Sequence, residues 1–133
     1  MKTQVQKTIY YDDTDAGGVV YHANYLRYMD HARSEFLTAS GFDFHVLQDE
    51  EQKAYVVGKV TISYRKSCQL GDKIVTTAAI KKIGRTSIDF EQTVLRNNEL
   101  MSEAVVTVVI IDLITKKPVK IPTSIIEAID RAK

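Results

Sequence analysis

The hydrophobic pattern of the chain predicts strands at its start and along its second half. Residues 4–11 carry β-branched and aromatic side chains and lead into an Asp- and Gly-rich turn, so a first strand is expected to end near Tyr11. In residues 53–65, apolar and polar positions alternate with the period of a β-strand that buries one face. Both segments are therefore expected to lie in a sheet.

Turn dipeptides divide the second half of the chain into strands. These dipeptides are Gly71-Asp72, Gly84-Arg85 and Asn97-Asn98. They predict four consecutive strands joined by hairpins, at residues 53–65, 73–83, 86–96 and 99–114. Residues 104–111 are apolar almost without alternation, which indicates a central strand covered on both faces. One face of this strand would meet a helix, and the other is available to another subunit.

A long helix is predicted between the first strand and the second. After Gly17-Gly18, apolar side chains recur at the spacing of a helix with one buried stripe, and Gly41 supplies a C-terminal cap. The stripe consists of Tyr25, Leu26, Met29, Ala32, Phe36 and Leu37. A Ser-x-x-Glu capping box at Ser124 and Glu127 predicts a second, short helix near the end of the chain. The order of these elements predicts an α+β fold in which the long helix packs on an antiparallel sheet.

Length, composition and charge limit the classes of protein to which the chain can belong. A chain of 133 residues that is 44% hydrophobic is long enough for one compact core, so a single domain over residues 1–133 is expected. The 18 Lys and Arg residues nearly balance the 17 Asp and Glu residues without a long run of one sign, which argues against nucleic acid as a partner. The longest apolar run, residues 105–111 with an interruption at Thr107, is far shorter than the roughly 20 residues that span a bilayer.

Cysteine content and the start of the chain indicate a cellular compartment. Cys68 has no second cysteine with which to form a disulfide within the chain. The first fifteen residues contain no long apolar segment of the kind that signal peptides carry. We therefore expect a reducing, cytoplasmic setting.

Candidate chemistry is concentrated in the loop before the long helix. Within eleven residues this loop holds three carboxylates and one histidine, namely Asp12, Asp13, Asp15 and His22. Such a loop brings acidic side chains close to unpaired backbone N–H groups and to the positive end of the helix dipole. A carboxylate base and a site for a negatively charged oxygen can therefore share one pocket. The same residues also fit a simpler role, because Asp beside Gly commonly caps backbone N–H groups in turns.

The motif in residues 13–25, Asp-Thr-Asp-x-x-Gly-Val-Val-Tyr-His-x-Asn-Tyr, resembles the signature of the 4-hydroxybenzoyl-CoA thioesterase and YbgC-type acyl-CoA thioesterase family. The resemblance extends to residues 32–35, to residues 84–87 and to the order of elements over nearly the whole chain. It implies the hotdog fold, in which a five-stranded antiparallel sheet wraps around one long helix. It also implies assembly into dimers that continue the sheet, and often into tetramers.

Roles for individual residues follow from this resemblance. The second Asp of the motif is the family's catalytic carboxylate, which implies that role for Asp15 as either a general base or a nucleophile. The start of the helix, at Tyr21 and His22, is expected to polarise the thioester carbonyl through a backbone N–H. The His22 imidazole is typical of the YbgC branch and points to acyl-CoA rather than a hydroxybenzoyl substrate. The residues expected to contact substrate or coenzyme A are Gly58, Arg85, Thr86 and Ser87, and neither a metal nor an organic cofactor is implied.

The expected function is hydrolysis of fatty acyl-CoA thioesters by a homo-oligomer, either a dimer or a dimer of dimers, without a membrane span. The alternative is a non-catalytic module that binds acyl thioesters or acyl carrier protein. Asp15 favours the enzyme, because a binding module has no use for a carboxylate beside the thioester. Asp12 and Asp13 are interpreted as loop acids, with Asp13 a candidate for holding the loop or the base.

Overall fold

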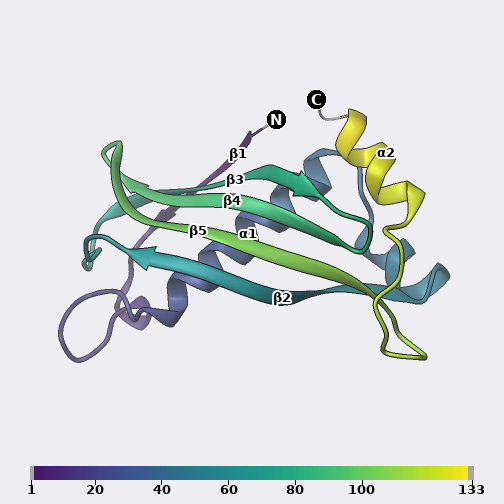
Figure 1. Cartoon of the computed structure of the whole chain (residues 1–133). Coiled ribbons are helices and arrows are strands. Elements are labelled where there is room, and N and C mark those ends of the chain that lie inside the picture. Colours follow the sequence, from purple (N-terminus) through teal and green to yellow (C-terminus); the bar gives the residue numbers. More distant parts are fainter. Residues whose placement is uncertain (1, 132–133) are drawn as a thin grey trace.

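The computed structural model describes residues 2–131 and shows a five-stranded antiparallel sheet that wraps around one long helix (Figure 1). The strands are β1 (Lys2–Thr8), β2 (Lys53–Tyr64), β3 (Lys73–Ile83), β4 (Ser87–Arg96) and β5 (Glu99–Asp112). The helices are α1 (Ala23–Ala39) and α2 (Thr123–Arg131), accompanied by a 3-10 turn, η1 (Tyr11–Asp13), and a π-helical turn, η2 (Val46–Glu50). The predicted α+β class and the predicted order of elements are confirmed.

The strand order in the sheet is β1-β3-β4-β5-β2, so β1 and β2 form its two edges. The strands β3, β4 and β5 form the predicted hairpins, but β2 pairs with β5 and not with β3. The prediction of four consecutive hairpin-linked strands is therefore wrong at its first turn. The physical reason lies in residues 65–72, where Gly71 N–H donates to Ile9 O and Ile9 N–H donates to Asp72 O. These bonds tie the connection to the end of β1 and direct the chain to the opposite half of the sheet.

One face of α1 supplies much of the core. Its buried members are Tyr25, Tyr28, Met29, Ala32, Arg33, Phe36 and Leu37. The Phe36 ring meets the Phe90 ring of β4 edge to face, with centroids 5.8 Å apart. Leu26 is 36% exposed, so its assignment to the buried stripe was wrong. Arg33 is buried instead, because its long aliphatic stem packs in the core while its guanidinium donates to Gln92 Oε1 at 2.8 Å.

Local hydrogen bonds set the ends of the first two elements. β1 ends at Thr8, before the predicted end at Tyr11. The reason is that Tyr10 N–H donates to the Asp13 carboxylate at 2.9 Å, which starts the 3-10 turn. α1 ends as predicted before Gly41, whose φ of 89° favours glycine.

The second helix is present where the sequence predicts it, but its predicted cap is wrong. α2 begins at Thr123, which places Ser124 inside the helix. The Ser124 hydroxyl donates to Glu51 Oε1 at 3.2 Å and is committed to that contact. α2 lies at the end of the sheet beside the β3–β4 turn, where Ile121 N–H donates to Arg85 O (Figure 1).

The apolar strand β5 lies between β4 and β2, which confirms its predicted central place. Its even-numbered residues from 102 to 110 are buried in the core. The odd-numbered residues from 103 to 111, on the other face, are only partly buried. The pattern predicted that both faces of β5 are covered. Within this chain only one face is fully covered.

Candidate active site

A tight loop between η1 and α1 carries Asp15. The loop is closed by a β-bridge between Thr14 and Val20. Inside it, Asp15 N–H donates to Val19 O at 2.9 Å, and Gly18 N–H donates to Asp15 O at 3.0 Å. Gly18 has a φ of 80°, a conformation that costs a residue with a Cβ about 1–2 kcal/mol. The backbone thus holds Asp15 at a defined position just before the helix.

The Asp15 carboxylate has one engaged oxygen and one oxygen without a partner among the described residues. Oδ1 accepts a hydrogen bond from Gly17 N–H at 2.8 Å, which is the turn role that the sequence also allowed. The side chain is exposed in the isolated chain. A carboxylate that is oriented through one oxygen keeps the other for a reacting group, so the turn role and a catalytic role are compatible.

The start of α1 presents backbone N–H groups next to this loop. Tyr21 N–H is not free, because it donates to Asp13 O at 2.9 Å. Within residues 2–131, His22 N–H makes no hydrogen bond. This amide lies at the positive end of the helix dipole, where a negatively charged oxygen is stabilised. Of the two predicted positions, His22 is therefore the one with an available donor.

Asp15 and His22 line the same pocket, which has a volume of about 220 Å³. The full set of lining residues is Asp15, Val19, Val20, His22, Tyr25, Tyr64, Arg65, Lys66 and Ser67. The Tyr64 hydroxyl donates to His22 O at 3.3 Å, and the two rings meet edge to face. The pocket therefore combines the carboxylate of Asp15 with His22, whose backbone N–H has no partner among residues 2–131, beside an aromatic wall.

Tyr25 forms part of this wall and accepts a hydrogen bond from Cys68 N–H at 3.1 Å. Burial raises the pKa of its hydroxyl to about 12. Burial also raises the pKa of the Cys68 thiol, so that neither group ionises readily near neutral pH. Among the described residues that line the pocket, Asp15 is the one with a carboxylate, which can act as a base.

The four residues predicted to contact substrate or coenzyme A are Gly58, Arg85, Thr86 and Ser87. None of them lines the Asp15 pocket of its own chain. Tyr64 of the pocket pairs with Ser102 on β5, whereas Ser87 pairs with Val109 on the same strand. At about 3.3 Å per residue, seven positions along β5 amount to roughly 23 Å. Gly58 lies between these ends on the edge strand β2, at a bulge where a Cβ would come within 2.9 Å of Val109 Cγ2.

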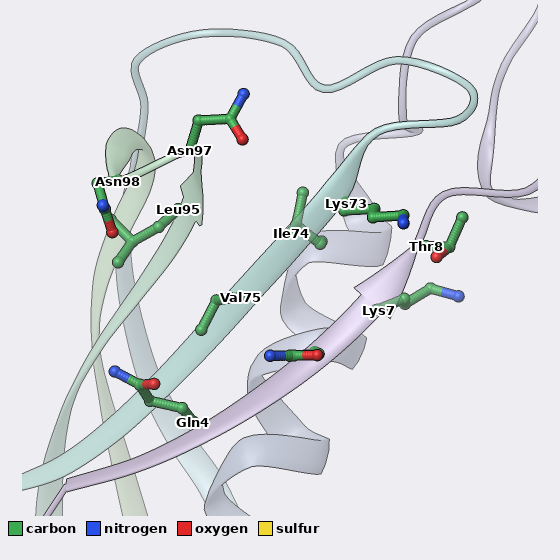
Figure 2. Close-up of a pocket in the computed structure, with 10 residues that line it drawn as sticks. Gln4, Lys7, Thr8, Lys73, Ile74, Val75, Leu95, Asn97 and Asn98 are labelled. Atoms are coloured by element: carbon green, nitrogen blue, oxygen red, sulfur yellow. The ribbon is translucent and has the colours of Figure 1, made fainter.

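A larger hollow, of about 450 Å³, lies on the sheet surface between β1, β3 and the β4–β5 turn (Figure 2). Amide, lysine, threonine and aliphatic side chains line it, and it contains no carboxylate, histidine or cysteine. The predicted catalytic residues are all absent from it. Its chemistry does not fit thioester hydrolysis, so the smaller Asp15 pocket is the candidate active site.

Asp13, interpreted from the sequence as a loop acid, is buried beside the site with partners that the sequence did not reveal. It is fully buried, and its carboxylate accepts hydrogen bonds from the Tyr28 hydroxyl at 2.5 Å and from Arg27 at 3.0 Å. Lys7 Nζ lies 3.2 Å from its other oxygen. Burial by itself raises the pKa of this carboxyl, but the hydrogen bonds from Tyr28, from Tyr10 N–H and from Lys7 hold it below its usual range. The side-chain donors come from β1 and α1, so the motif that contains Asp13 does not by itself reveal its burial.

Two further properties bear on the class of site. No helix among residues 2–131 combines the length and apolar character needed to cross a membrane. The same part of the chain contains no group of three or more His, Cys, Asp or Glu side chains arranged to hold a metal ion.

Comparison with known proteins identifies the family. Residues 10–129 match the family model of the thioesterase-like superfamily. The chain is 38% identical over 125 residues to the acyl-CoA thioesterase YbgC of Haemophilus influenzae, covering 94% of this chain and 92% of that protein. It is 40% identical over 119 residues to the acyl-CoA thioester hydrolase YbgC of an Escherichia coli O6:H1 strain, covering 89% of this chain and 88% of the relative.

The fold has counterparts among solved structures. A mutant of 4-hydroxybenzoyl-CoA thioesterase in complex with 4-hydroxybenzoyl-CoA superimposes with a TM-score of 0.88 at 19% identity, covering 96% of this chain and 97% of that one. At this identity the likeness concerns the fold, and it confirms the predicted hotdog architecture. Taken with the matches in sequence, it shows that the chain belongs to the YbgC family of acyl-CoA thioester hydrolases within the thioesterase-like superfamily.

Proposed function

We propose that this hydrolase cleaves fatty acyl-CoA thioesters to the free acid and coenzyme A, with Asp15 as its catalytic carboxylate and His22 N–H as an oxyanion donor. The observation that carries the proposal is the pocket of about 220 Å³ that Asp15 and His22 line together. Membership of a family of acyl-CoA thioester hydrolases supports the reaction class. Residues 1–133 are proposed to act as one thioesterase domain in the cytoplasm.

The chemistry requires a base or nucleophile on one side of the thioester carbonyl and a hydrogen-bond donor on the other. As negative charge develops on the carbonyl oxygen, one oriented donor in a dry site contributes roughly 10²- to 10³-fold to the rate. His22 N–H is proposed as that donor, because it lies at the helix start and has no partner in the described part of the chain, whereas Tyr21 N–H donates to Asp13 O.

Asp15 can act by either of two routes. As a general base it takes a proton from water, whose oxygen attacks the carbonyl carbon, and the carbon–sulfur bond then breaks to release coenzyme A. As a nucleophile, a carboxylate oxygen attacks the carbon itself, coenzyme A leaves, and water hydrolyses the resulting mixed anhydride. Both routes use the Asp15 oxygen that has no partner in the described part of the chain.

Two neighbouring side chains are proposed to assist rather than to carry the reaction. The His22 imidazole packs between the rings of Tyr21 and Tyr64, with centroid distances of 4.8 Å and 6.2 Å. A ring held in this way can orient water or polarise the carbonyl. The thiolate of coenzyme A leaves readily, so acid catalysis by His22 is the lesser role.

The active protein is proposed to be a homo-oligomer whose sites lie between subunits. Arg85, Thr86 and Ser87 lie roughly 23 Å from the Asp15 pocket along β5, by the spacing of a strand, so they are proposed to contact coenzyme A bound at the pocket of a neighbouring subunit. The edge strand β2 supports this assembly, because Val56 and Val57 are 40% and 49% exposed there and an unpaired edge readily pairs with another strand. A dimer would continue the sheet through β2, and two dimers would give a homotetramer.

The test is free-thiol release from a panel of acyl-CoA substrates of increasing chain length, with wild type, Asp15→Asn and Asp12→Asn compared. Asp12 is an exposed carboxylate in the same segment and serves as the matched control. We expect Asp15→Asn to lose at least about 10²-fold in kcat with its fold intact, since a catalytic base typically contributes that much. Asp12→Asn should stay within about threefold of wild type, because a surface acid outside the site has no role in proton transfer.

The outcomes separate the possible functions. Activity that falls only in Asp15→Asn supports the proposal, and the panel then gives the preferred acyl length. Wild-type activity in Asp15→Asn would remove this residue from the mechanism. Absence of turnover by wild type, with acyl-CoA still bound, would favour the non-catalytic binding module.

A further inference from the structure

Asp13 is a buried carboxylate that the proposed reaction does not use directly. It has no exposed surface, so it does not touch substrate. Its side chain joins three elements of the fold, since Lys7 belongs to β1, Tyr10 precedes η1, and Arg27 and Tyr28 belong to α1. A fully buried carboxylate is costly unless it is paired and hydrogen-bonded, and here both oxygens have charged and neutral donors.

The main chain of the same residue holds the start of α1. Asp13 O accepts hydrogen bonds from Tyr21 N–H and from the side-chain amide of Asn24, both at 2.9 Å. Its side chain contacts β1 and the second turn of α1, and its carbonyl accepts from Tyr21 and Asn24, which lie on either side of His22 in the sequence. One residue therefore sets the spacing between the Asp15 loop, two positions along the chain, and the helix start.

The pattern of bonds also distinguishes the two backbone amides just before α1. Tyr21 N–H is held by Asp13 O, whereas the next amide along the chain, His22 N–H, has no hydrogen-bond partner among residues 2–131. If Asp13 shifted, Tyr21 N–H would be released and the helix start would lose its register against Asp15. A misplacement of about 1 Å in an active site can cost on the order of 10²-fold in rate.

We propose that Asp13 is a positioning residue for thioester hydrolysis, which anchors the Asp15 loop and selects His22 N–H as the oxyanion donor by engaging Tyr21 N–H with its carbonyl. The proposal rests on the proposed function, because it assigns Asp13 an effect through Asp15 and His22. Asp13 is therefore expected to affect the rate of the chemical step as well as the stability of the fold.

The experiment compares Asp13→Asn, Tyr28→Phe and Phe90→Leu with wild type in the thiol-release assay. Asp13→Asn keeps the shape of the side chain and removes its charge, and Tyr28→Phe removes one donor and keeps the buried ring. Phe90→Leu is the matched control, because it weakens the core from β4, where the Phe90 ring packs against Phe36. All assays are run at a temperature at which circular dichroism shows every variant to be folded.

We expect kcat to fall about 10- to 100-fold in Asp13→Asn and several-fold in Tyr28→Phe, with KM within about threefold of wild type. Phe90→Leu should retain kcat although it unfolds at a lower temperature. Amide hydrogen exchange gives an independent readout: Tyr21 N–H, which donates to Asp13 O, should be protected in wild type and should exchange faster in Asp13→Asn.

The results that would overturn the positioning role of Asp13 differ from those that would overturn the proposed function. Wild-type kcat in folded Asp13→Asn, or in Tyr28→Phe if Asp13→Asn does not fold, would overturn the positioning role. A loss of kcat in Phe90→Leu equal to that in Asp13→Asn would reduce Asp13 to a structural residue. Full activity of Asp15→Asn would instead overturn the proposed function, whatever the Asp13 variants do.

Discussion

Two adjacent glycines in the Asp15 loop are expected to respond differently to the same substitution. A Cβ at Gly17 would lie 3.2 Å from Asp15 Oδ1, whereas a Cβ at Gly18 would have no other heavy atom within 4 Å. Gly18 has a φ of 80°, and Gly17 is not among the residues with positive φ. Gly17→Ala therefore presses on the candidate catalytic carboxylate, and Gly18→Ala strains the backbone.

The structure gives the size of each effect. Gly18→Ala should cost about 1–2 kcal/mol of unfolding free energy, the cost of a left-handed conformation for a residue with a Cβ. For a chain of this size, that corresponds to a fall of about 3–8 °C in Tm. Gly17→Ala requires the carboxylate to move by a few tenths of an ångström. We expect kcat to fall about 3- to 30-fold for such a shift, with little change in Tm.

The assay pairs thermal unfolding with thiol release for each variant at one protein concentration, since association affects Tm. The reasoning predicts that Gly17→Ala loses mainly activity and that Gly18→Ala loses mainly stability. The reverse pattern would refute it. Equal losses in both quantities for both variants would show that the loop responds as a unit and that the contact at Oδ1 has no separate importance.

Three further predictions concern the core and the buried carboxylate. Phe36→Ala should lower the free energy of unfolding by about 3–5 kcal/mol in urea titration, because it empties a buried site against Phe90. Gln92→Leu should cost about 1–3 kcal/mol, because it leaves buried Arg33 without the acceptor at 2.8 Å, and a cost near zero would contradict the importance of that bond. The pKa of Asp13 is lower in the folded state than its ordinary value of 3.8, so its contribution to stability is complete above that value and is lost as pH falls through the folded pKa. Urea titrations of wild type and Asp13→Asn between pH 6 and pH 2.5 should therefore converge at the acid end, and a constant difference would contradict the assignment.

Local periodicity predicted most elements of this fold to within a few residues. The helix stripe and its glycine cap, and the strands from Lys53 onward, depend on the spacing of side chains within one segment, which the sequence displays directly. The buried stripe was predicted to include Leu26, which is exposed, and not Arg33, whose guanidinium finds an acceptor on Gln92 of a distant strand. Periodicity contains no information about such a partner.

Pairing between distant segments was the part that the sequence did not predict. β2 pairs with β5, and the connection after β2 is bonded to Ile9, which is far from it in the sequence. The burial of Asp13 was likewise not predicted. Its neighbours in the sequence suggest a turn, whereas its partners Lys7 and Tyr28 come from β1 and α1. The motif placed Asp15 and His22 near one another because both lie in one short segment at the start of a helix.

The central claim is that the thioester carbonyl binds between Asp15 and the start of α1. The most direct measurement is a crystal structure of Asp15→Asn with an intact fatty acyl-CoA. We predict that the carbonyl oxygen lies about 2.7–3.1 Å from His22 N, that the residue at position 15 faces the carbonyl carbon, and that Arg85 of a neighbouring subunit contacts coenzyme A. A carbonyl bound away from His22 N, for example in the hollow between β1 and β3, would contradict the account.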